Sequence, residues 1–296
     1  MLLKVKKKIL FIVNPVSGVF QKHNIDQKIG DTIDSQHYDY DIQFTEYSGH
    51  ATILAKEAAS NGTDIVVAVG GDGSINEVAN GIAYTDVALG VIPLGSGNGY
   101  ARHLNIPLNV SKALQVINRG KIDAIDIGVT GDRYFISNAG VGFVSIVANE
   151  FKQHHLHGFF SYAMAVLKKY FPYRGRTYNI EIDGRAIQRQ AFFVVVGNTR
   201  ELGYHFSATP KADVRDGYFD VLILKPFPKL LGLFTVPFSY FQLTHKWYSS
   251  EFHRAKTVKI YQEYESIVEL DGDPFPWNES PLKVDVCHLA LKVVIP

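Results

Sequence analysis

The chain has 296 residues, which is enough for about two domains, and 46% of them are hydrophobic, as in an ordinary globular protein. Its net charge of +1 provides no strong field, so we expect no nucleic-acid partner. The single cysteine, Cys287, excludes an intrachain disulfide and fits a reducing, cytoplasmic location. No apolar stretch has the length needed to span a bilayer, so any membrane contact is expected to be peripheral.

The N-terminal part alternates between predicted strands and helices. Apolar runs predict strands over residues 8–14, 38–47, 65–69, 87–92 and 122–129. Helical patterns lie between them, over residues 51–59, after residue 74, near residues 100–103 and over residues 110–119. This repeated β–α order predicts a Rossmann-like α/β domain, with a mostly parallel sheet and helices on both of its faces.

The pattern changes near residue 128. One helix is predicted over residues 159–170, and strands are predicted over residues 134–140, 178–182, 191–197, 218–224, 257–261, 267–270, 282–286 and 289–295. Many strands separated by turn signals, such as Asp183-Gly184, predict an antiparallel β-sandwich. We therefore expect a nucleotide-binding α/β domain over residues 1–128 and a β-sandwich domain over residues 129–296.

The most informative stretch is DIVVAVGGDGSINE, from residue 64 to residue 77. A buried strand runs into Gly70, Gly71, Asp72 and Gly73, and the S-x-x-E spacing that follows predicts a capping box at a helix start. A strand, glycine-rich turn and helix in that order place free backbone N–H groups at the carboxyl edge of the sheet, where a phosphate binds well. A carboxylate there would repel phosphate unless it binds a cation or accepts a proton, which favours Mg²⁺-dependent phosphoryl transfer. The alternative is an ordinary β–α turn.

Two further polar loops follow predicted strands, at residues 14–18 and 94–99. In open α/β sheets ligands bind at the carboxyl ends of the strands, so all three loops could converge on one nucleotide. The spacing excludes a P-loop, because no G-x-x-x-x-G-K-[ST] occurs. Tyr100 stands where a dinucleotide fingerprint has glycine, and no protein-kinase motif is present.

Five motifs together resemble the diacylglycerol kinase catalytic-domain family, which includes bacterial lipid kinases and sphingosine kinases. They are Asn14-Pro15-x-Ser17-Gly18, Ser48-Gly49-His50-Ala51, Gly70-Gly71-Asp72-Gly73-Ser74 with Asn76 and Glu77, Pro93-Leu94-Gly95-Ser96-Gly97-Asn98, and Asp271-Gly272-Asp273. The resemblance implies that ATP binds between a nucleotide domain and a β-sandwich domain, with nucleotide and acceptor lipid meeting in the interdomain cleft. It also implies that the last strand returns to the first domain.

The resemblance also implies roles for individual residues. Contacts to the nucleotide would come from Asn14, Ser17, Gly18, Gly49, His50, Gly70, Gly71, Asp72, Gly73, Ser74, Gly95, Ser96 and Asn98. Asp72 would lie at the phosphates and Mg²⁺, and Glu77 would shape its loop. Asp271 would be the general base that takes the proton from a lipid hydroxyl.

Three positions depart from the usual family pattern. Ser74 and Ser96 replace threonine and keep the hydroxyl group, whereas Asp273 replaces glutamate and is one methylene shorter. Without the resemblance, Asp271-Gly272 would be interpreted as a hairpin turn, like Asp183-Gly184.

Two other groups of residues could bind metal. Asp213, Asp216 and Asp220 surround a turn, and in several bacterial relatives the corresponding stretch holds a structural Mg²⁺; a solvated turn is the equal alternative. His154, His155 and His157 lack a further spaced ligand, and we interpret them as surface residues.

A lipid substrate requires access to a membrane surface. Residues 230–241 are rich in Leu and Phe, and residues 159–176 combine aromatic side chains with lysine and arginine, a composition that suits an interfacial helix. The preferred interpretation is that both segments cover the core of the sandwich, because apolar stripes at helical spacing usually do so.

We expect an ATP- and Mg²⁺-dependent lipid kinase that phosphorylates a hydroxyl of diacylglycerol or a related lipid alcohol. One alternative is an NAD kinase-like enzyme, which shares the Gly-Gly-Asp-Gly loop. Another is a non-catalytic lipid- or nucleotide-binding relative, against which the presence of both Asp72 and Asp271 argues. The sequence leaves the acceptor lipid and homodimer formation open.

Overall fold

The computed structural model describes residues 6–17, 24–153, 158–203, 206–261 and 266–296. The chain forms two compact units, the first comprising Met1–Ile125 with Leu289–Pro296 and the second Asp126–His288. It passes into the second unit within strand β5 (Ile122–Thr130) and returns within strand β18 (Leu282–Val294).

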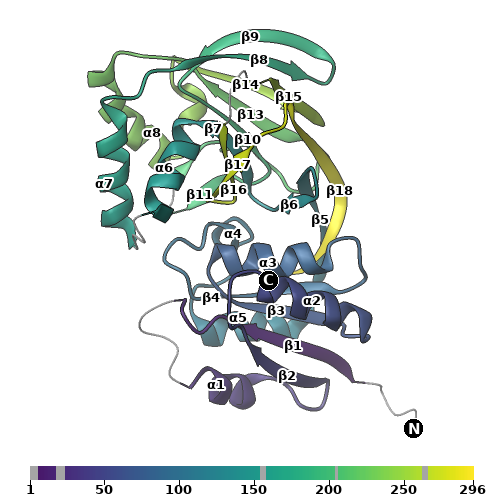
Figure 1. Cartoon of the computed structure of the whole chain (residues 1–296). Helices are drawn as coiled ribbons and strands as arrows, with labels where there is room; N and C mark the ends of the chain where they lie inside the picture. The colour runs from purple at the N-terminus through teal and green to yellow at the C-terminus, as the bar shows by residue number, and fades with distance from the viewer. Residues whose placement is uncertain (1–5, 18–23, 154–157, 204–205, 262–265) are drawn as a thin grey trace. The chain divides into compact units, whose positions relative to one another are not determined.

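The first unit is built on a parallel sheet with strand order β2-β1-β3-β4 (Figure 1). Its strands are β1 (Lys7–Val13), β2 (Tyr38–Phe44), β3 (Ile65–Gly70) and β4 (Ala88–Pro93). Every residue of β3 and β4 is buried, as their continuous apolar sequences predict for strands covered on both faces. The last part of β18 adds a parallel strand, with Lys292 beside Ala88 of β4.

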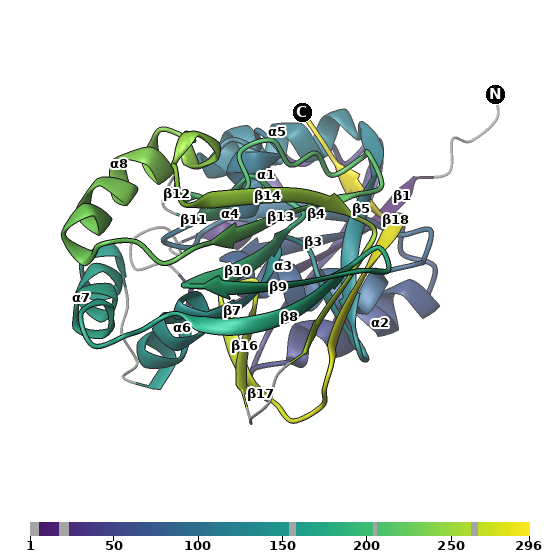
Figure 2. The same cartoon turned by 90° about the horizontal axis from the view of Figure 1, so that it is seen from above.

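Two pairs of helices cover this sheet, one pair on each face (Figure 1 and Figure 2). Helix α2 (His50–Ser60) packs on α3 (Asp72–Ile82), and α1 (Ile25–Thr32) packs on α5 (Val110–Arg119); the short α4 spans Gly99–His103. The side chain of Asn118 joins the second pair, since its amide donates to the Thr32 carbonyl at 2.7 Å. The predicted α/β class of this part of the chain is confirmed.

The second unit is an antiparallel β-sandwich, as predicted. One sheet has the order β14-β13-β10-β7-β16-β17, with β14 at Ser250–Ala255, β13 at Phe219–Leu224, β10 at Phe193–Gly197, β7 at Asn138–Gly142, β16 at Ser266–Leu270 and β17 at Asp273–Trp277. The facing layer pairs β9 (Arg185–Ala191), β8 (Arg176–Ile182), β15 (Thr257–Tyr261) and the first part of β18. Short strands lie at Arg133–Phe135 (β6), Glu201–Gly203 (β11) and Phe206–Ser207 (β12).

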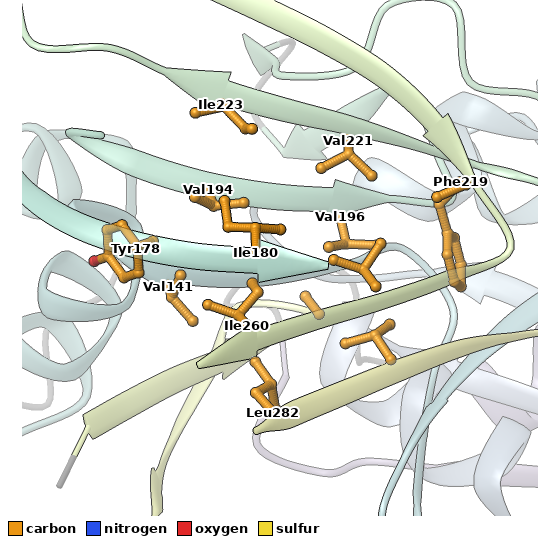
Figure 3. Packing of buried hydrophobic residues seen from close by; sticks show 14 of the residues in the cluster. Val141, Tyr178, Ile180, Val194, Val196, Phe219, Val221, Ile223, Ile260 and Leu282 are labelled. Atoms are coloured by element: carbon orange, nitrogen blue, oxygen red, sulfur yellow. The ribbon is translucent and has the colours of Figure 1, made fainter. Parts of the chain in front are cut away.

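The core of this unit lies between the two layers (Figure 3). Val194 and Val196 of β10 and Val221 of β13 point into it from one sheet, and Ile180 of β8 and Ile260 of β15 meet them from the other. The alternation along β10 is strict, because Val195 packs on the opposite side in a separate cluster with Ala208 and Leu222. Side chains therefore alternate between the core and the outer side of the sheet, as in a β-sandwich.

Helices cover the outer side of the sheet that runs from β14 to β17. They are α6 (Phe143–Gln153), α7 (Gly158–Tyr170) and α8 (Thr235–Tyr240), with 3₁₀ turns η1 at Lys229–Phe234 and η2 at Thr244–Lys246. Helix α6 packs against β7, β16 and β17. The sequence patterns did not predict α6, β14 or β17. The single strand predicted over residues 134–140 is two strands, β6 and β7, because the chain leaves extended pairing at Ile136 and Ser137. The strands expected over 282–286 and 289–295 are one continuous strand.

The sandwich core provides a direct test of this packing. Phe219 is fully buried and stacks on Phe135 with ring centroids 5.7 Å apart. We expect Phe219→Ala to lower the free energy of unfolding by about 3–5 kcal/mol, because it leaves a cavity. Phe44→Ala removes the same atoms from a side chain that is 52% exposed, and should change the free energy by less than about 0.5 kcal/mol. Urea unfolding of both variants is the measurement, and similar losses would contradict the packing described.

Candidate nucleotide site and the Asp271 hairpin

Three polar loops meet at the carboxyl ends of β1, β3 and β4 in the first unit. The Leu94 N–H donates to the Gly70 carbonyl at 2.7 Å, and the Asn14 N–H donates to the Val69 carbonyl at 3.0 Å. The Asn14 side-chain amide donates to the Ser74 hydroxyl at 3.0 Å. The structure therefore brings together the loops at residues 14–17, 70–74 and 94–99.

Two of these loops touch through glycine. A Cβ atom added to Gly95 would lie 2.6 Å from the Cα of Gly71, closer than real side chains come to backbone. A Cβ atom on Gly70 would lie 2.4 Å from the hydroxyl of Ser74. These glycines are required by the close approach of the loops, which leaves main chain rather than side chains at the sheet edge.

Helix α3 begins at Asp72, with Gly71 as its N-cap and no side chain capping its first turn. The predicted capping box between Ser74 and Glu77 is therefore wrong, since the N-cap is Gly71, three residues before Ser74. The first N–H groups of α3 and the positive end of its dipole lie at the loop cluster, an arrangement that suits an anion.

Glu77 instead caps a different helix. Its two carboxylate oxygens accept hydrogen bonds from the N–H of Gly49 at 2.9 Å and the N–H of Ala51 at 3.2 Å, at the start of α2. Gly49 has a φ of 89°, a conformation that favours glycine. Glu77 thus shapes the 49–51 segment. The sequence analysis predicts instead that it shapes its own loop. His50 stacks on Tyr47 and accepts a hydrogen bond from the Glu46 N–H at its Nδ1.

The carboxylate of Asp72 reaches across to α4. One oxygen accepts the N–H of Gly99 and the other the N–H of Tyr100, both at 3.1 Å. Asp72 therefore caps α4 and fixes the loop that precedes it. Burial raises the pKa of Asp72, against the opposing effect of these N–H groups.

The remaining predicted residues of the 94–99 loop are held by their neighbours. Asn98 adopts a left-handed conformation, with its amide donating to the Gly95 carbonyl at 2.7 Å and its oxygen accepting the Gly95 N–H at 2.9 Å. Ser96 is exposed at the tip of the loop. Ser17 donates from its hydroxyl to the Asn14 carbonyl, whereas Gly18 lies outside the described residues.

The donor set at this edge is compatible with Mg²⁺. The part of the chain that the structure describes contains no group of three or more His, Cys, Asp or Glu side chains placed to hold a metal. Kinase sites, however, hold Mg²⁺ through one or two carboxylates together with water and substrate phosphates. Asp72 provides such a carboxylate at the N-terminus of α3.

Asp271 lies in the second unit, at the turn between β16 and β17. Asp271 and Gly272 have φ values of 50° and 87°, as in a type I′ hairpin turn. The Asp271 carboxylate accepts three backbone N–H groups, from Ile136 at 2.8 Å, Ser137 at 2.7 Å and Asn138 at 3.0 Å. The turn interpretation therefore holds for the backbone. The Asp271 side chain is in addition hydrogen-bonded to the segment between β6 and β7, where strand pairing is interrupted.

A second carboxylate below this turn was missed by the sequence analysis. Glu269 is 5% exposed, and burial raises its pKa to about 8. It accepts both contacts of the Asn138 side-chain amide, at 3.0 and 2.9 Å, and the N–H of Gly272. The alternation of β16 would place Glu269 on the side away from the core, and α6, which was not predicted, packs against β16 there.

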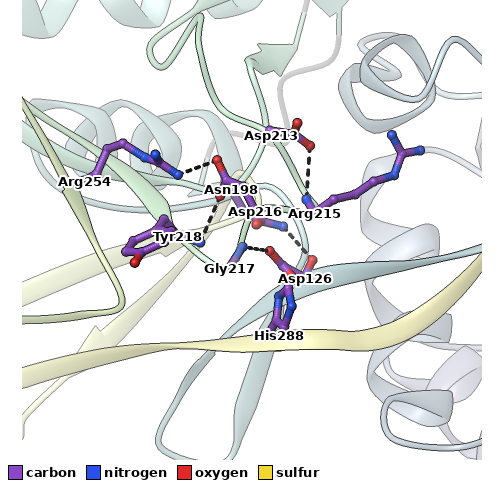
Figure 4. A network of polar contacts seen from close by, with 9 residues as sticks. All are labelled: Asp126, Asn198, Asp213, Arg215, Asp216, Gly217, Tyr218, Arg254 and His288. Atoms are coloured by element: carbon purple, nitrogen blue, oxygen red, sulfur yellow. Dashed lines mark hydrogen bonds and ion pairs between the residues drawn. The ribbon is translucent and has the colours of Figure 1, made fainter.

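Within the described residues, Asp213, Asp216 and Asp220 form no group placed to hold a metal ion. Figure 4 shows that Asp213 and Asp216 have different partners. Asp213 accepts the Arg215 N–H, whereas Asp216 accepts the Tyr218 N–H and forms an ion pair with Arg254. Burial raises the pKa of Asp220. The Arg254 guanidinium group thus lies beside the Asp216 carboxylate, and metal binding by this cluster stays a prediction. His154, His155 and His157 lie outside the described residues.

Figure 4 also shows a buried carboxylate beside this turn. Asp126 is fully buried, and its two oxygens accept the Gly217 N–H and contact the Nδ1 of His288, both at 2.7 Å. The amide of Asn198 donates to the Asp126 carbonyl at 2.8 Å. These contacts help to fix the end of the 213–217 turn.

A parallel α/β unit with main-chain N–H groups at its carboxyl edge suits the binding of a phosphate group, and the chain continues from it into an antiparallel sandwich. The family model "Diacylglycerol kinase catalytic domain" matches residues 8–130, and "YegS C-terminal NAD kinase beta sandwich-like domain" matches residues 137–295. The chain belongs to the diacylglycerol kinase catalytic-domain family, and so is a phosphotransferase with an alcohol group as acceptor.

Individual relatives agree with this assignment. The chain is 34% identical over 226 residues to a diacylglycerol kinase of Bacillus subtilis, covering 74% of each sequence, and 34% identical to one of Staphylococcus aureus, covering 74% of this chain and 71% of the relative. A crystal structure of a diacylglycerol kinase from Bacillus anthracis matches with a TM-score of 0.74 at 21% identity, over 98% of this chain and 97% of that one. At that identity the structural match establishes the fold.

The contact between Gly71 and Gly95 can be tested without a ligand. We expect Gly95→Ala to lower the free energy of unfolding by about 1–3 kcal/mol, because its Cβ would force the two loops apart. Gly73→Ala is the matched control: apart from its chain neighbours and the backbone of its own helix, no atom lies within 4 Å of its added Cβ, and alanine favours a helix by up to about 1 kcal/mol. Urea unfolding in the absence of nucleotide compares them. A Gly95→Ala variant as stable as Gly73→Ala would show that the loops are not in contact.

Proposed function

We propose that the protein is an ATP- and Mg²⁺-dependent lipid kinase that phosphorylates a hydroxyl group of diacylglycerol or a closely related lipid alcohol. The carrying observation is the convergence of three loops on the uncapped N-terminus of α3, with Asp72 beside it. The relatives at 34% identity are diacylglycerol kinases, which supports diacylglycerol as the first acceptor to test.

The first unit would bind the nucleotide phosphates. The N–H groups of the first turn of α3 point toward the loop cluster, and the hydroxyls of Ser17 and Ser74 lie around Gly70. Main-chain donors at a helix N-terminus suit phosphate because the helix dipole favours negative charge and the donors are fixed before the ligand arrives. Bound Mg²⁺ would neutralise charge that develops on the phosphates, and Asp72 is the carboxylate that would hold it.

The second unit would provide the base. As the lipid oxygen forms its bond to the γ-phosphorus, the bond from that phosphorus to the β,γ-bridging oxygen breaks, and ADP leaves with its electron pair. The hydroxyl proton passes to the Asp271 carboxylate and from there to water. The three N–H groups that hold Asp271 fix its orientation, which favours proton transfer.

The experiment that tests this function is transfer of labelled phosphate from ATP, with Mg²⁺, into a panel that contains diacylglycerol, phosphatidylglycerol, a sphingoid base and, separately, NAD. We expect label in a lipid and none in NAD. Asp271→Asn should lower kcat by about 10²–10⁴-fold, because it removes the proton acceptor. Asp72→Asn should mainly weaken the binding of Mg²⁺ and ATP.

Asp183→Asn is the control for Asp271→Asn. Asp183 also begins a type I′ turn of the sandwich, with φ values of 45° and 83° for Asp183 and Gly184, and it accepts two backbone N–H groups, from Lys256 and Thr257. The Asp183→Asn variant should retain activity close to that of the wild type. Label in NAD alone would favour the NAD kinase-like alternative. Bound ATP with no transfer to any acceptor would favour a binding protein that does not catalyse transfer.

We also propose that the second unit contacts the membrane peripherally, through a face made by α7 and η1. No helix within the described ranges is long and apolar enough to cross a bilayer. Met164, Leu167, Phe171 and Leu230 are exposed on this α7–η1 face. On the other side of α7, Tyr170 packs on Phe143 and Phe192 in an aromatic cluster, as the core-facing interpretation expected.

The two segments of the α7–η1 face are joined. The Tyr170 hydroxyl donates to the Lys229 carbonyl at 2.8 Å, and the Lys229 ammonium donates to the Phe171 carbonyl. Lys168 and Lys169 form ion pairs with the buried Glu150 of α6, so part of their charge is compensated. Exposed apolar side chains beside basic groups suit the headgroup region of an anionic bilayer.

Phe171→Glu should weaken binding to vesicles that contain anionic phospholipid by about tenfold or more, because it replaces apolar burial with charge repulsion. Phe44→Glu is the matched control, since Phe44 is exposed to nearly the same extent, 52% against 56%, in the first unit. Co-sedimentation with vesicles measures both. Equal binding by the two variants would show that another surface meets the membrane.

A further inference from the structure

A buried carboxylate lowers the stability of the folded state when it is ionised, because a charge that is unpaired or only partly paired is disfavoured away from water. Glu269 is such a group, and the reaction as described above makes no use of it. It lies directly opposite Gly140 in the β16–β7 pairing and opposite Pro274 in β17. A Cβ atom on Gly140 would lie 2.7 Å from one oxygen of Glu269 and 2.7 Å from Val144 of α6. The glycine thus leaves the space that the carboxylate fills beneath the helix.

Glu269 is connected to Asp271 by two routes. Its oxygen accepts the N–H of Gly272, the second residue of the type I′ turn that Asp271 begins. Its two oxygens also accept the side-chain amide of Asn138, and the backbone of that same residue donates to the Asp271 carboxylate. The Asp271 N–H in turn donates to the Asn138 carbonyl at 3.0 Å. One buried group therefore fixes both the turn that carries Asp271 and the segment that its carboxylate contacts.

We propose that Glu269 is a positioning residue for Asp271, and that its ionisation sets the strength of Asp271 as the base for phosphate transfer. This inference rests on the lipid kinase function proposed above. The geometry serves both protonation states, because the Asn138 amide can donate to an ionised carboxylate or, turned over, accept from a neutral one. What changes between the states is the charge near Asp271.

The surroundings place this change close to physiological pH. Burial raises the pKa of Glu269 to about 8, with a further contribution from the negative charges of Asp271 and Asp273. The other charged groups nearby are already paired: on α6, Lys152 pairs with Asp273, and Glu150 pairs with Lys168 and Lys169 of α7. Strand β7 contributes no titratable side chain. As the pH rises through about 8, Glu269 ionises and makes Asp271 a stronger proton acceptor.

The test is the pH profile of kcat for the intact protein between pH 6 and 9.5, for wild type, Glu269→Gln and Glu269→Ala. We expect the wild-type kcat to rise through an apparent pKa of about 8. Glu269→Gln, which keeps the shape and the hydrogen bonds, should match the wild type at pH 6.5 and lack that rise. Glu269→Ala should lose about tenfold or more at every pH, because the turn is no longer fixed. Asp273→Asn, on the same hairpin, should keep the rise at a lower pH.

A second readout does not depend on activity. The folded-state pKa of Glu269 is above the ordinary 4.5, so the folded state retains a proton that the unfolded chain has lost. The stability that this contributes is present below pH 4.5 and is lost as the pH rises toward 8. Relative to Glu269→Gln, the folding equilibrium constant of the wild type should fall by about tenfold per pH unit across that window. Urea midpoints at several pH values measure it.

The outcomes separate the two proposals. An active wild type whose kcat profile superimposes on that of Glu269→Gln overturns the role of Glu269 and leaves the kinase function standing. A wild type that transfers no phosphate overturns both. Stability profiles of wild type and Glu269→Gln that remain parallel would show that Glu269 does not titrate in this range, which also overturns the inference.

Discussion

The arrangement of the proposed nucleotide site depends on the contact between the 70–74 and 94–99 loops. Gly71 and Gly95 meet backbone to backbone, and the Asp72 carboxylate accepts the N–H groups of Gly99 and Tyr100. These contacts order both loops before any ligand binds, so the main-chain donors of α3 need little reorganisation. Preorganised donors stabilise charge far better than mobile ones in a reaction that is largely positioning and electrostatics.

The elements of the first unit could be predicted well from sequence, because each is determined by a local pattern. Strands β3 and β4 are unbroken apolar runs, and α5 was expected over the same residues that it occupies, Val110–Arg119. The second unit was harder. Helix α6 was missed, and so was β17, whose sequence contains two prolines at residues 274 and 276. Sheet pairing and helix packing override weak local preferences at such places.

The site residues also divide into those that a local sequence pattern reveals and those that depend on distant contacts. The three loops could be located because glycine clusters follow predicted strands, and the structure brings them together. Glu77 was assigned to the wrong partner, since its spacing to Ser74 fits a local cap while its carboxylate is used by the N-terminus of α2. Glu269 could not be found at all: in an alternating strand it would be interpreted as a solvent-facing residue, and its burial follows from the packing of α6. Contacts made over long sequence separations leave no local signal.

The most direct test of this account is a crystal structure with Mg²⁺ and a non-hydrolysable ATP analogue. The account predicts that the β- and γ-phosphates bind at the N–H groups of the first turn of α3, with the metal ion on the side of the Asp72 carboxylate, while Gly71 and Gly95 keep their contact. Phosphates bound away from the three loops, or loops that separate to admit them, would contradict the claim that this edge of the sheet is a preformed phosphate site.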